Sequence, residues 1–295
     1  ASHANRRAHE HTLLFLRLMT AQPLKDFSRL CVHTITTKGW ELEEAVDRYG
    51  EAGVSGITVW RQWLEGRNPA EAGQRIRAAG IEVVSLCRGG FYPGLEEKSR
   101  EESVEDNKRA IEDAAALGAP LVVLVCGAVP GQSLVESRKQ ITDGIASTLP
   151  LAESLGVKLA IEPLHPMYAD DRSAINTLGT ANEICDELNH PLVGIAFDVY
   201  HLWWDPDLEG QTQRAADANR LFAYHVCDWM TPTSDLLNDR GLMGEGCIDL
   251  RGIRGMVEGA GFDGMIEVEV FSNRWWEKPT AEFLEAIQQA YLQHT

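Results

Sequence analysis

The sequence has little positive charge and no long apolar segment. Its 27 lysines and arginines face 44 aspartates and glutamates, which gives a formal net charge of −17 at pH 7, and no run of basic residues breaks this excess. Because so much negative charge repels a phosphate backbone, we expect no nucleic-acid partner. No apolar stretch reaches the length of a membrane span, so we expect no membrane association either.

Cysteine is sparse as well, and its spacing contains no Cys-x-x-Cys pair. Four of the six cysteines lie in apolar, strand-like contexts. Reduced, buried thiols of this kind are typical of a reducing compartment, so the sequence predicts a cytoplasmic protein. The six are Cys31, Cys87, Cys126, Cys185, Cys227 and Cys247.

The N-terminus carries a short apolar segment that resembles a signal peptide only faintly. Residues 11–24 follow two arginines, but Arg17 interrupts the apolar part and no convincing small-residue cleavage site follows. We interpret residues 1–27 as an N-terminal extension, either an extra helix or an ill-ordered segment. Residues 28–295 are then expected to form one domain, since no linker-like stretch divides them.

The rest of the chain alternates short apolar, β-branched runs with longer stretches of helical periodicity. Nearly continuous apolar strands separated by helices indicate parallel strands covered on both faces. Eight such units predict an α/β fold, a closed (β/α)8 TIM barrel, and the lack of a Gly-x-Gly-x-x-Gly motif after the first strand disfavours an open doubly wound sheet. The expected strands span residues 30–35, 56–60, 81–87, 120–126, 157–162, 193–198, 221–227 and 265–271.

Charged or imidazole side chains lie at or near the ends of the last four expected strands. The active sites of such barrels lie at the carboxyl ends of the strands, and residues two apart in a strand share a face. The fifth, sixth and seventh strands each place an alanine in the barrel and a ligand-type residue at its mouth, while the eighth offers Glu267 and Glu269 on one face. The pairs are Ala160 and Glu162, Ala196 and Asp198, and Ala223 and His225.

Two glutamates, an aspartate and a histidine at one mouth predict a divalent metal site, because the acidic groups would repel one another without a cation between them. The alternative is that each residue makes its own salt bridge or helix cap. Oxygen ligands with one imidazole favour Mn²⁺, Mg²⁺ or Co²⁺ over a structural zinc site, although Zn²⁺ stays open. We expect one ion per chain, with Mn²⁺ as the first choice.

Histidine and tryptophan cluster near the same strand ends. His201 follows Asp198 by three residues and His165 follows Glu162 by three, so either can reach a metal-bound substrate; the alternative is a loop histidine bonded to backbone. The eight tryptophans, Trp203 among them, all lie at or soon after expected strand ends. Their faces suit stacking on sugar rings, whereas the alternative is packing between loops or at a subunit interface.

At this point the sequence resembles a known family. The motifs IEPLHP, FDVYHLWWD, HVCDW, NDRGLMGEGCIDL and DGMIEVEVF are similar to those of the xylose isomerase-like barrel superfamily, in its sugar isomerase/epimerase branch, which includes ketose 3-epimerases and inosose isomerases. The similarity runs from about residue 28 onward, with the motifs concentrated after residue 157. One departure is the loop after the fifth strand: this chain has PLHPMYADD in place of the family's pattern with a second acidic residue, which leaves the substrate in doubt.

The resemblance implies roles for individual residues. The metal ligands would be Glu162, Asp198, His225 and Glu269, with both glutamates also acting as catalytic acid and base. His201 and Arg240 would contact substrate oxygens, and a homodimer would be expected. His165 and Trp203 complete the predicted substrate-binding set. Glu267 would then be a polar residue one layer lower, bonded to a neighbouring strand.

Taken together, these features predict a metal-dependent isomerase or epimerase of a small-molecule sugar or cyclitol, acting on a ketose, inosose or keto-sugar. It would remove a proton next to a carbonyl and form an enediolate. The alternative within enzymes is a dehydratase or lyase that uses the same site. An abasic-site endonuclease and a non-catalytic sugar-binding protein are disfavoured, the former because Trp60 and Cys126 stand where it needs histidines. Phosphorylated substrates stay open, because Lys38, Arg61, Arg88 and Arg274 lie near expected strand ends.

Overall fold

The computed structural model describes residues 21–295. Most of the expected N-terminal extension therefore lies outside the described residues, and the division at residue 28 stays a prediction. Within the described part, the backbone amide of Ala21 donates to the carbonyl oxygen of Arg251 at 3.1 Å. Leu24 and Phe27 pack against the hydrophobic core, so the chain lies along the barrel before its first strand begins.

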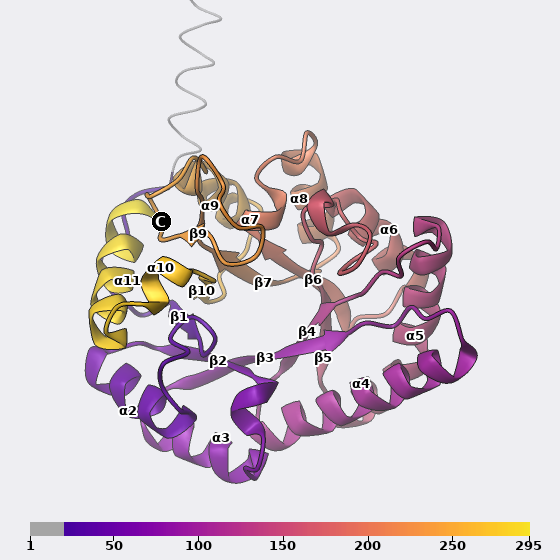
Figure 1. The fold of residues 1–295 in the computed structure, drawn as a ribbon, viewed down its shortest axis with the longest axis horizontal. Helices are drawn as coiled ribbons and strands as arrows, with labels where there is room; N and C mark the ends of the chain where they lie inside the picture. Colours follow the sequence, from indigo (N-terminus) through magenta and orange to yellow (C-terminus); the bar gives the residue numbers. More distant parts are fainter. Residues whose placement is uncertain (1–20) are drawn as a thin grey trace, which may run out of the picture.

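Eight parallel strands close into a barrel, which confirms the predicted fold (Figure 1). Their order around the barrel is β1-β10-β7-β6-β5-β4-β3-β2, so the first strand and the last one pair and close the sheet. The strands are β1 (Leu30–His33), β2 (Gly56–Trp60), β3 (Glu82–Gly90), β4 (Leu121–Val125), β5 (Lys158–Ile161), β6 (Val193–Asp198), β7 (Leu221–Val226) and β10 (Ile266–Val268).

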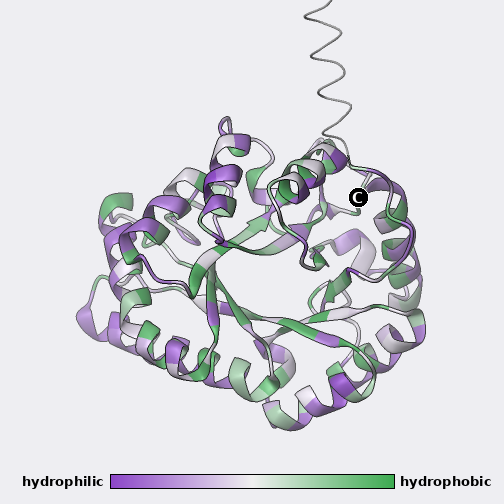
Figure 2. Ribbon diagram, turned by 180° about the vertical axis from the view of Figure 1, so that it is seen from behind, coloured by the Kyte–Doolittle hydropathy of each residue, from purple (hydrophilic) through white to green (hydrophobic). Residues whose placement is uncertain are grey.

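Helices surround the strands as a ring, with apolar faces toward the sheet and polar faces outward (Figures 1 and 2). The long helices are α2 (Leu42–Ala52), α3 (Pro69–Ala78), α4 (Glu97–Leu117), α5 (Leu134–Leu155), α6 (Leu178–Leu188), α8 (Leu208–Asp217), α9 (Leu250–Gly259) and α11 (Thr280–His294). Gly118 and Gly156 end α4 and α5 in the left-handed conformation, with φ of 85° and 68°. No helix within residues 21–295 is long and apolar enough to cross a membrane.

Short helices and a two-stranded sheet lie at the carboxyl ends of the strands. They are η1 (Arg61–Leu64), η2 (Pro166–Tyr168), α7 (Val199–Leu202), α10 (Asn273–Trp276) and the antiparallel pair β8 (Asp228–Trp229) and β9 (Arg240–Gly241). Asp198 caps α7, since its Oδ1 accepts a hydrogen bond from the amide of Tyr200 at 2.8 Å. These elements hold the side chains of the barrel mouth at fixed positions.

Small side chains fill the barrel interior beneath that mouth. Ala160, Ala196 and Ala223 are all buried there, with Val123 and Cys87. The alanines occupy the inward positions that the alternation predicted. Because they are small, the barrel leaves room above and between them for polar side chains.

One stability prediction follows from the packing of α3 against the end of α4. A Cβ added at Gly73 would overlap the carbonyl oxygen of Leu117, which also accepts a hydrogen bond from Arg77 Nη1 at 3.0 Å. We expect Gly73→Ala to lower the free energy of unfolding by about 1–3 kcal/mol through overpacking. Scanning calorimetry would measure this as a lower melting temperature. Gly259→Ala is the control, because nothing lies within 4 Å of the added Cβ, and it should leave the stability unchanged or raise it. Equal losses of stability in the two variants would contradict the prediction.

Candidate metal centre

The four predicted metal ligands lie together at the carboxyl end of the barrel. Asp198 is the last residue of β6, and His225 lies opposite it in β7. Glu162 and Glu269 directly follow the last residues of β5 and β10. Each residue offers one ligand atom, and these atoms lie within 4.8 Å of one another. All four side chains are buried, so the structure gathers the oxygen and imidazole donors that hard divalent cations accept.

Arg240 supplies positive charge to this cluster. It lies in β9, and its Nη1 donates to Glu269 Oε2 at 2.8 Å and to Asp198 Oδ2 at 3.1 Å. Burial raises the pKa of Asp198 above its ordinary range; the charge of Arg240 opposes the rise, and that of Glu269 adds to it. The carboxylates therefore fit a cation, because they already bind one cationic group. A divalent ion held by them would share these oxygens with the guanidinium or take them from it.

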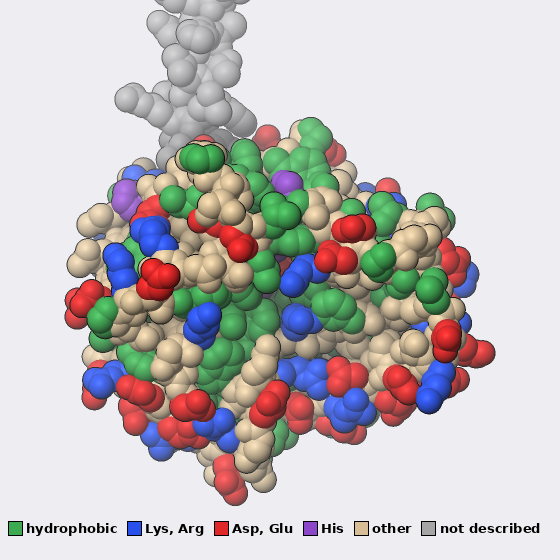
Figure 3. Space-filling view, in the orientation of Figure 1, with side chains coloured by type: hydrophobic (Ala, Val, Ile, Leu, Met, Phe, Trp, Pro, Cys, Tyr) green, Lys and Arg blue, Asp and Glu red, His purple; other side chains and the backbone are tan. Residues whose placement is uncertain are grey.

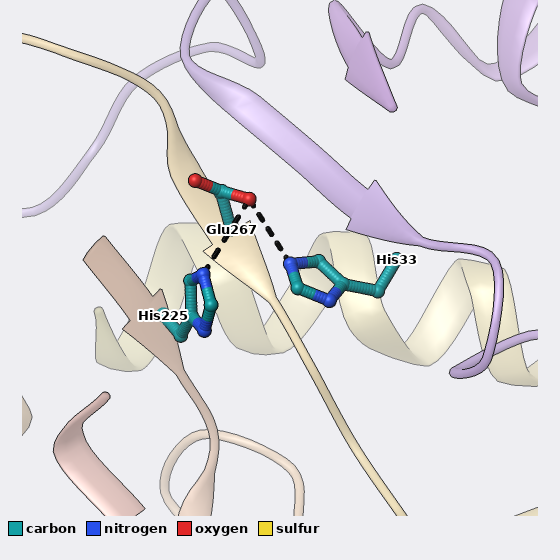
Figure 4. Close-up of side chains that lie close together, drawn as sticks. All are labelled: His33, His225 and Glu267. Atoms are coloured by element: carbon teal, nitrogen blue, oxygen red, sulfur yellow. Dashed lines mark hydrogen bonds and ion pairs between the residues drawn. The ribbon is translucent and has the colours of Figure 1, made fainter. Parts of the chain in front are cut away.

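A second polar layer lies directly below, around Glu267 (Figure 4). Glu267 Oε2 lies 3.0 Å from His33 Nε2 and accepts hydrogen bonds from Thr58 at 2.6 Å and from Ser85 at 3.3 Å. The same oxygen lies 3.7 Å from His225 Nε2. Burial raises the pKa of Glu267, but His225 and His33 outweigh it, so the net shift is downward. Glu267 is therefore an ionised carboxylate bonded to neighbouring strands, as the sequence predicted.

Two histidines connect this lower layer to the two glutamates above it. His33 Nδ1 lies 3.0 Å from Glu269 Oε1, and His225 Nδ1 lies 3.1 Å from Glu162 Oε1. Burial lowers the pKa of His225, but Glu267 and Glu162 raise it to about 10. Each histidine thus lies between a glutamate of the upper layer and Glu267. The arrangement is a shared network rather than four separate salt bridges.

His33 is a site residue that the sequence reasoning missed. It ends β1 and is fully buried, although histidine is usually at least partly exposed. A polar residue at the carboxyl end of an apolar strand (LCVH) was the available signal. Its partners could not be read from the sequence, because Glu267 and Glu269 are more than 230 residues away and reach it only through closure of the barrel.

Of the predicted substrate-binding residues, His201 and Arg240 line the cavity above the cluster, together with Glu162 and Glu269. His201 is buried; burial and the charge of Arg240 hold its pKa well below the ordinary value, so it is neutral. Its Nε2 lies 3.2 Å from Arg240 Nη2, and its Nδ1 lies 3.2 Å from the amide of His165. A neutral imidazole accepts at only one nitrogen, so only one of these contacts is a full hydrogen bond.

His165 and Trp203 are not among the residues that line the cavity. His165 Nδ1 accepts from the amide of Met167 at 3.2 Å, and its ring packs 4.8 Å from Trp229. Trp203 packs on the same Trp229 at 5.7 Å. The aromatic residues that line the cavity are Trp60, Tyr168 and Phe271. Direct substrate contact by His165 and Trp203 stays a prediction, and the structure gives both a packing role.

Comparison with known proteins places this site in a family. Residues 46–290 match the family described as xylose isomerase-like TIM barrel. An inosose isomerase of Bacillus subtilis (strain 168) is 32% identical over 216 residues, which is 71% of this chain and 74% of that protein. A 3-dehydroshikimate dehydratase of Pseudomonas putida is 21% identical over 259 residues, 85% of this chain and 39% of that protein.

Solved structures with a similar fold support this family assignment. A protein from Sinorhizobium meliloti 1021 superposes with a TM-score of 0.87 at 46% identity, covering 90% of this chain and 98% of that one. The IOLI protein with a binding zinc atom superposes with a TM-score of 0.78 at 23% identity, covering 89% and 96%. The chain belongs to the xylose isomerase-like TIM barrel family. Within that family, it is an enzyme of the isomerase and epimerase class.

Proposed function

We propose that this enzyme is a metal-dependent isomerase or epimerase of a ketose, inosose or keto-sugar that works by proton abstraction next to a carbonyl. The observation that carries the proposal is the buried cluster of Glu162, Asp198, His225 and Glu269, whose ligand atoms lie within 4.8 Å of one another at the barrel mouth. These four would hold one divalent ion. Three carboxylates and one imidazole favour Mn²⁺, although the IOLI neighbour was solved with zinc.

The bound ion would supply Lewis-acid stabilisation of the negative charge that develops on substrate oxygens. Two residues of the chain then carry out the two proton transfers. Glu162 or Glu269 takes the proton from the carbon next to the carbonyl, which leaves an enediolate, and the other glutamate returns a proton. Return to the opposite face of the same carbon gives an epimer, and return to the neighbouring carbon gives an isomer.

Neighbouring groups would hold these glutamates in position. His33 and Arg240 bond the carboxylate of Glu269, and His225 bonds that of Glu162. Both carboxylates also face the cavity in which a substrate would lie. His201 and Arg240, at the wall of the same cavity, would bind substrate oxygens and keep the reacting carbon between the two glutamates.

A second candidate is a dehydratase or lyase of keto-sugars. It is favoured by the similarity to 3-dehydroshikimate dehydratases of two Pseudomonas species, 21% and 23% identical. The same proton abstraction drives elimination when the enolate carries a leaving group. A cytoplasmic location is also proposed, because the five cysteines of the barrel interior and its helices are buried free thiols. A homodimer stays a prediction from the family.

Proton exchange into substrate tests the proposal. The enzyme, loaded with Mn²⁺ for activity and exchanged to Mg²⁺ for clean spectra, would be incubated in D₂O with ketoses, inososes and 3-keto-glucosides. We expect loss of one C–H signal by NMR, dependent on the metal, together with an epimer or isomer. Accumulation of an unsaturated product would favour the dehydratase. Product without deuterium uptake, or neither product nor exchange across the panel, would contradict the proposed proton transfer.

A further inference from the structure

Two arginines at the mouth of the active-site cavity have no acidic partner. Arg88 lies near the end of β3 and Arg172 in the loop after η2, and both line the cavity together with Glu162 and Glu269. Within residues 21–295, neither guanidinium has a carboxylate within 4.0 Å or a hydrogen-bond acceptor. Every other arginine in that range donates a side-chain hydrogen bond.

This is unexpected in so acidic a chain. With 44 acidic residues against 27 basic ones, a surface arginine finds a carboxylate easily. Arg61, one strand away, forms a bidentate pair with Asp106 at 2.8 and 3.1 Å. Figure 3 shows basic side chains beside the hollow at the centre of the view. The lack of partners is therefore specific to the cavity.

Both guanidiniums are held in place by aromatic rings rather than by acids. Arg88 lies over the ring of Phe91 at 4.3 Å, and Arg172 over that of Tyr168 at 5.6 Å. Arg88 is half-buried, and burial lowers its pKa, as does the nearby charge of Arg172. Two partly buried like charges that line one cavity are unfavourable unless an anion joins them. A guanidinium presents a planar fork of donors that matches a carboxylate or a phosphate.

The other basic residues near strand ends do not share this position. Lys38 lies over the ring of Trp276 at 3.4 Å, and Arg274 forms an ion pair with Glu245. Neither they nor Arg61 line the cavity with Glu162 and Glu269. Of the four basic residues that the sequence suggested for an anion, only Arg88 lines the cavity. Arg172, which the sequence did not suggest, lines it as well.

We propose that Arg88 and Arg172 form a subsite for an oxyanion, so that the substrate is a keto-sugar or cyclitol derivative bearing a carboxylate or phosphate group away from the reacting carbon. This inference rests on the proposed isomerase or epimerase function, because it assumes that the substrate occupies the cavity above the glutamates. The two arginines would bind the anionic end while Glu162 and Glu269 act on the carbonyl end. Neutral sugars would lack the group that the subsite binds.

Three matched probes test the subsite: D-fructose, D-fructose 6-phosphate and D-fructuronate, which carry a hydroxyl, a phosphate or a carboxylate at the sixth carbon. Titration calorimetry on the metal-loaded wild-type enzyme should show that one anionic probe binds about tenfold or more tightly than fructose. The preferred anion distinguishes phosphate from carboxylate. Equal affinities for all three probes would overturn the proposal without the need for any variant.

Variants then assign the effect to the two arginines. Arg88→Gln and Arg172→Gln should each remove most of the preference for the anion, lowering the affinity for the anionic probe far more than that for fructose at equal metal content. Arg75→Gln is the matched control, because it removes the same charge from a surface pair with Asp47. A preference that survives in the double variant would overturn the subsite. Deuterium uptake separates the two proposals. Arginine-dependent anion binding without exchange defeats only the proposed reaction. Metal-dependent exchange, together with an anion preference that depends on neither arginine, defeats only the subsite.

Discussion

Glu269→Gln should reduce turnover at saturating metal by about 10²–10⁴-fold, the range expected for loss of a catalytic acid or base. Glu269 lines the cavity, whereas Glu267, two residues earlier, points into the lower layer. Glutamine keeps the shape of the side chain but cannot accept the substrate proton. The rate of deuterium uptake into substrate in D₂O measures the effect directly.

Glu267→Gln is the matched comparison, since it makes the same chemical change on the same strand. This substitution should reduce turnover by only about 10–100-fold, because Glu267 acts through His33 and His225 rather than on the substrate. Metal content measured on each variant would show whether a loss reflects missing metal or missing proton transfer. Equal losses in the two variants at full metal occupancy would contradict the assignment of Glu269 as the acid–base residue.

The positions of these residues were largely readable from the sequence. The alternation of apolar strands with helices predicted the barrel, and the barrel placed residues at strand ends on one mouth. Strand lengths differ from the expected runs in both directions: β3 extends to Gly90, whereas β10 covers only Ile266–Val268 of the expected 265–271, and Glu269 follows it. This shortening did not affect the prediction, because the side chains keep alternating beyond the last ladder bond.

Contacts between strands that are distant in sequence were not readable. His33 is bonded to Glu267 and Glu269 because β1 pairs with β10, and no local pattern indicates that pairing. The position of Arg240 between two carboxylates depends on the β8–β9 pair, whose strands are two residues each and carry no periodicity. The unpartnered state of Arg88 depends on every acidic side chain around it. A sequence gives composition and spacing, but not which charges end up paired.

Removal of the metal should abolish turnover while leaving the barrel folded. A chelator takes away the Lewis acid on which proton abstraction depends, so activity should fall to background. The fold should persist, because these carboxylates keep cationic partners without the metal. Arg240 already binds Asp198 and Glu269, and His33 lies against the carboxylate of Glu267. Circular dichroism should therefore be unchanged. The free energy of unfolding should fall only by the lost binding free energy, about 2.7 kcal/mol for an ion at one hundred times its Kd, with a correspondingly lower melting temperature.

Adding metal back to the chelated enzyme completes the test. Mn²⁺, Mg²⁺, Co²⁺ and Zn²⁺ would be titrated separately, and activity should return at one ion per chain, since the described residues contain one cluster of four donors, two of which line the cavity. Asp198→Asn, which removes a ligand without removing a catalytic glutamate, should weaken the recovery by raising the ion concentration that is needed. Full turnover in the chelated enzyme, with no metal detected by mass spectrometry, would contradict a metal-dependent reaction. Recovery that needs two ions per chain would instead point to a second site around His33, His225 and Glu267, whose ligand atoms also lie within 4.8 Å of one another.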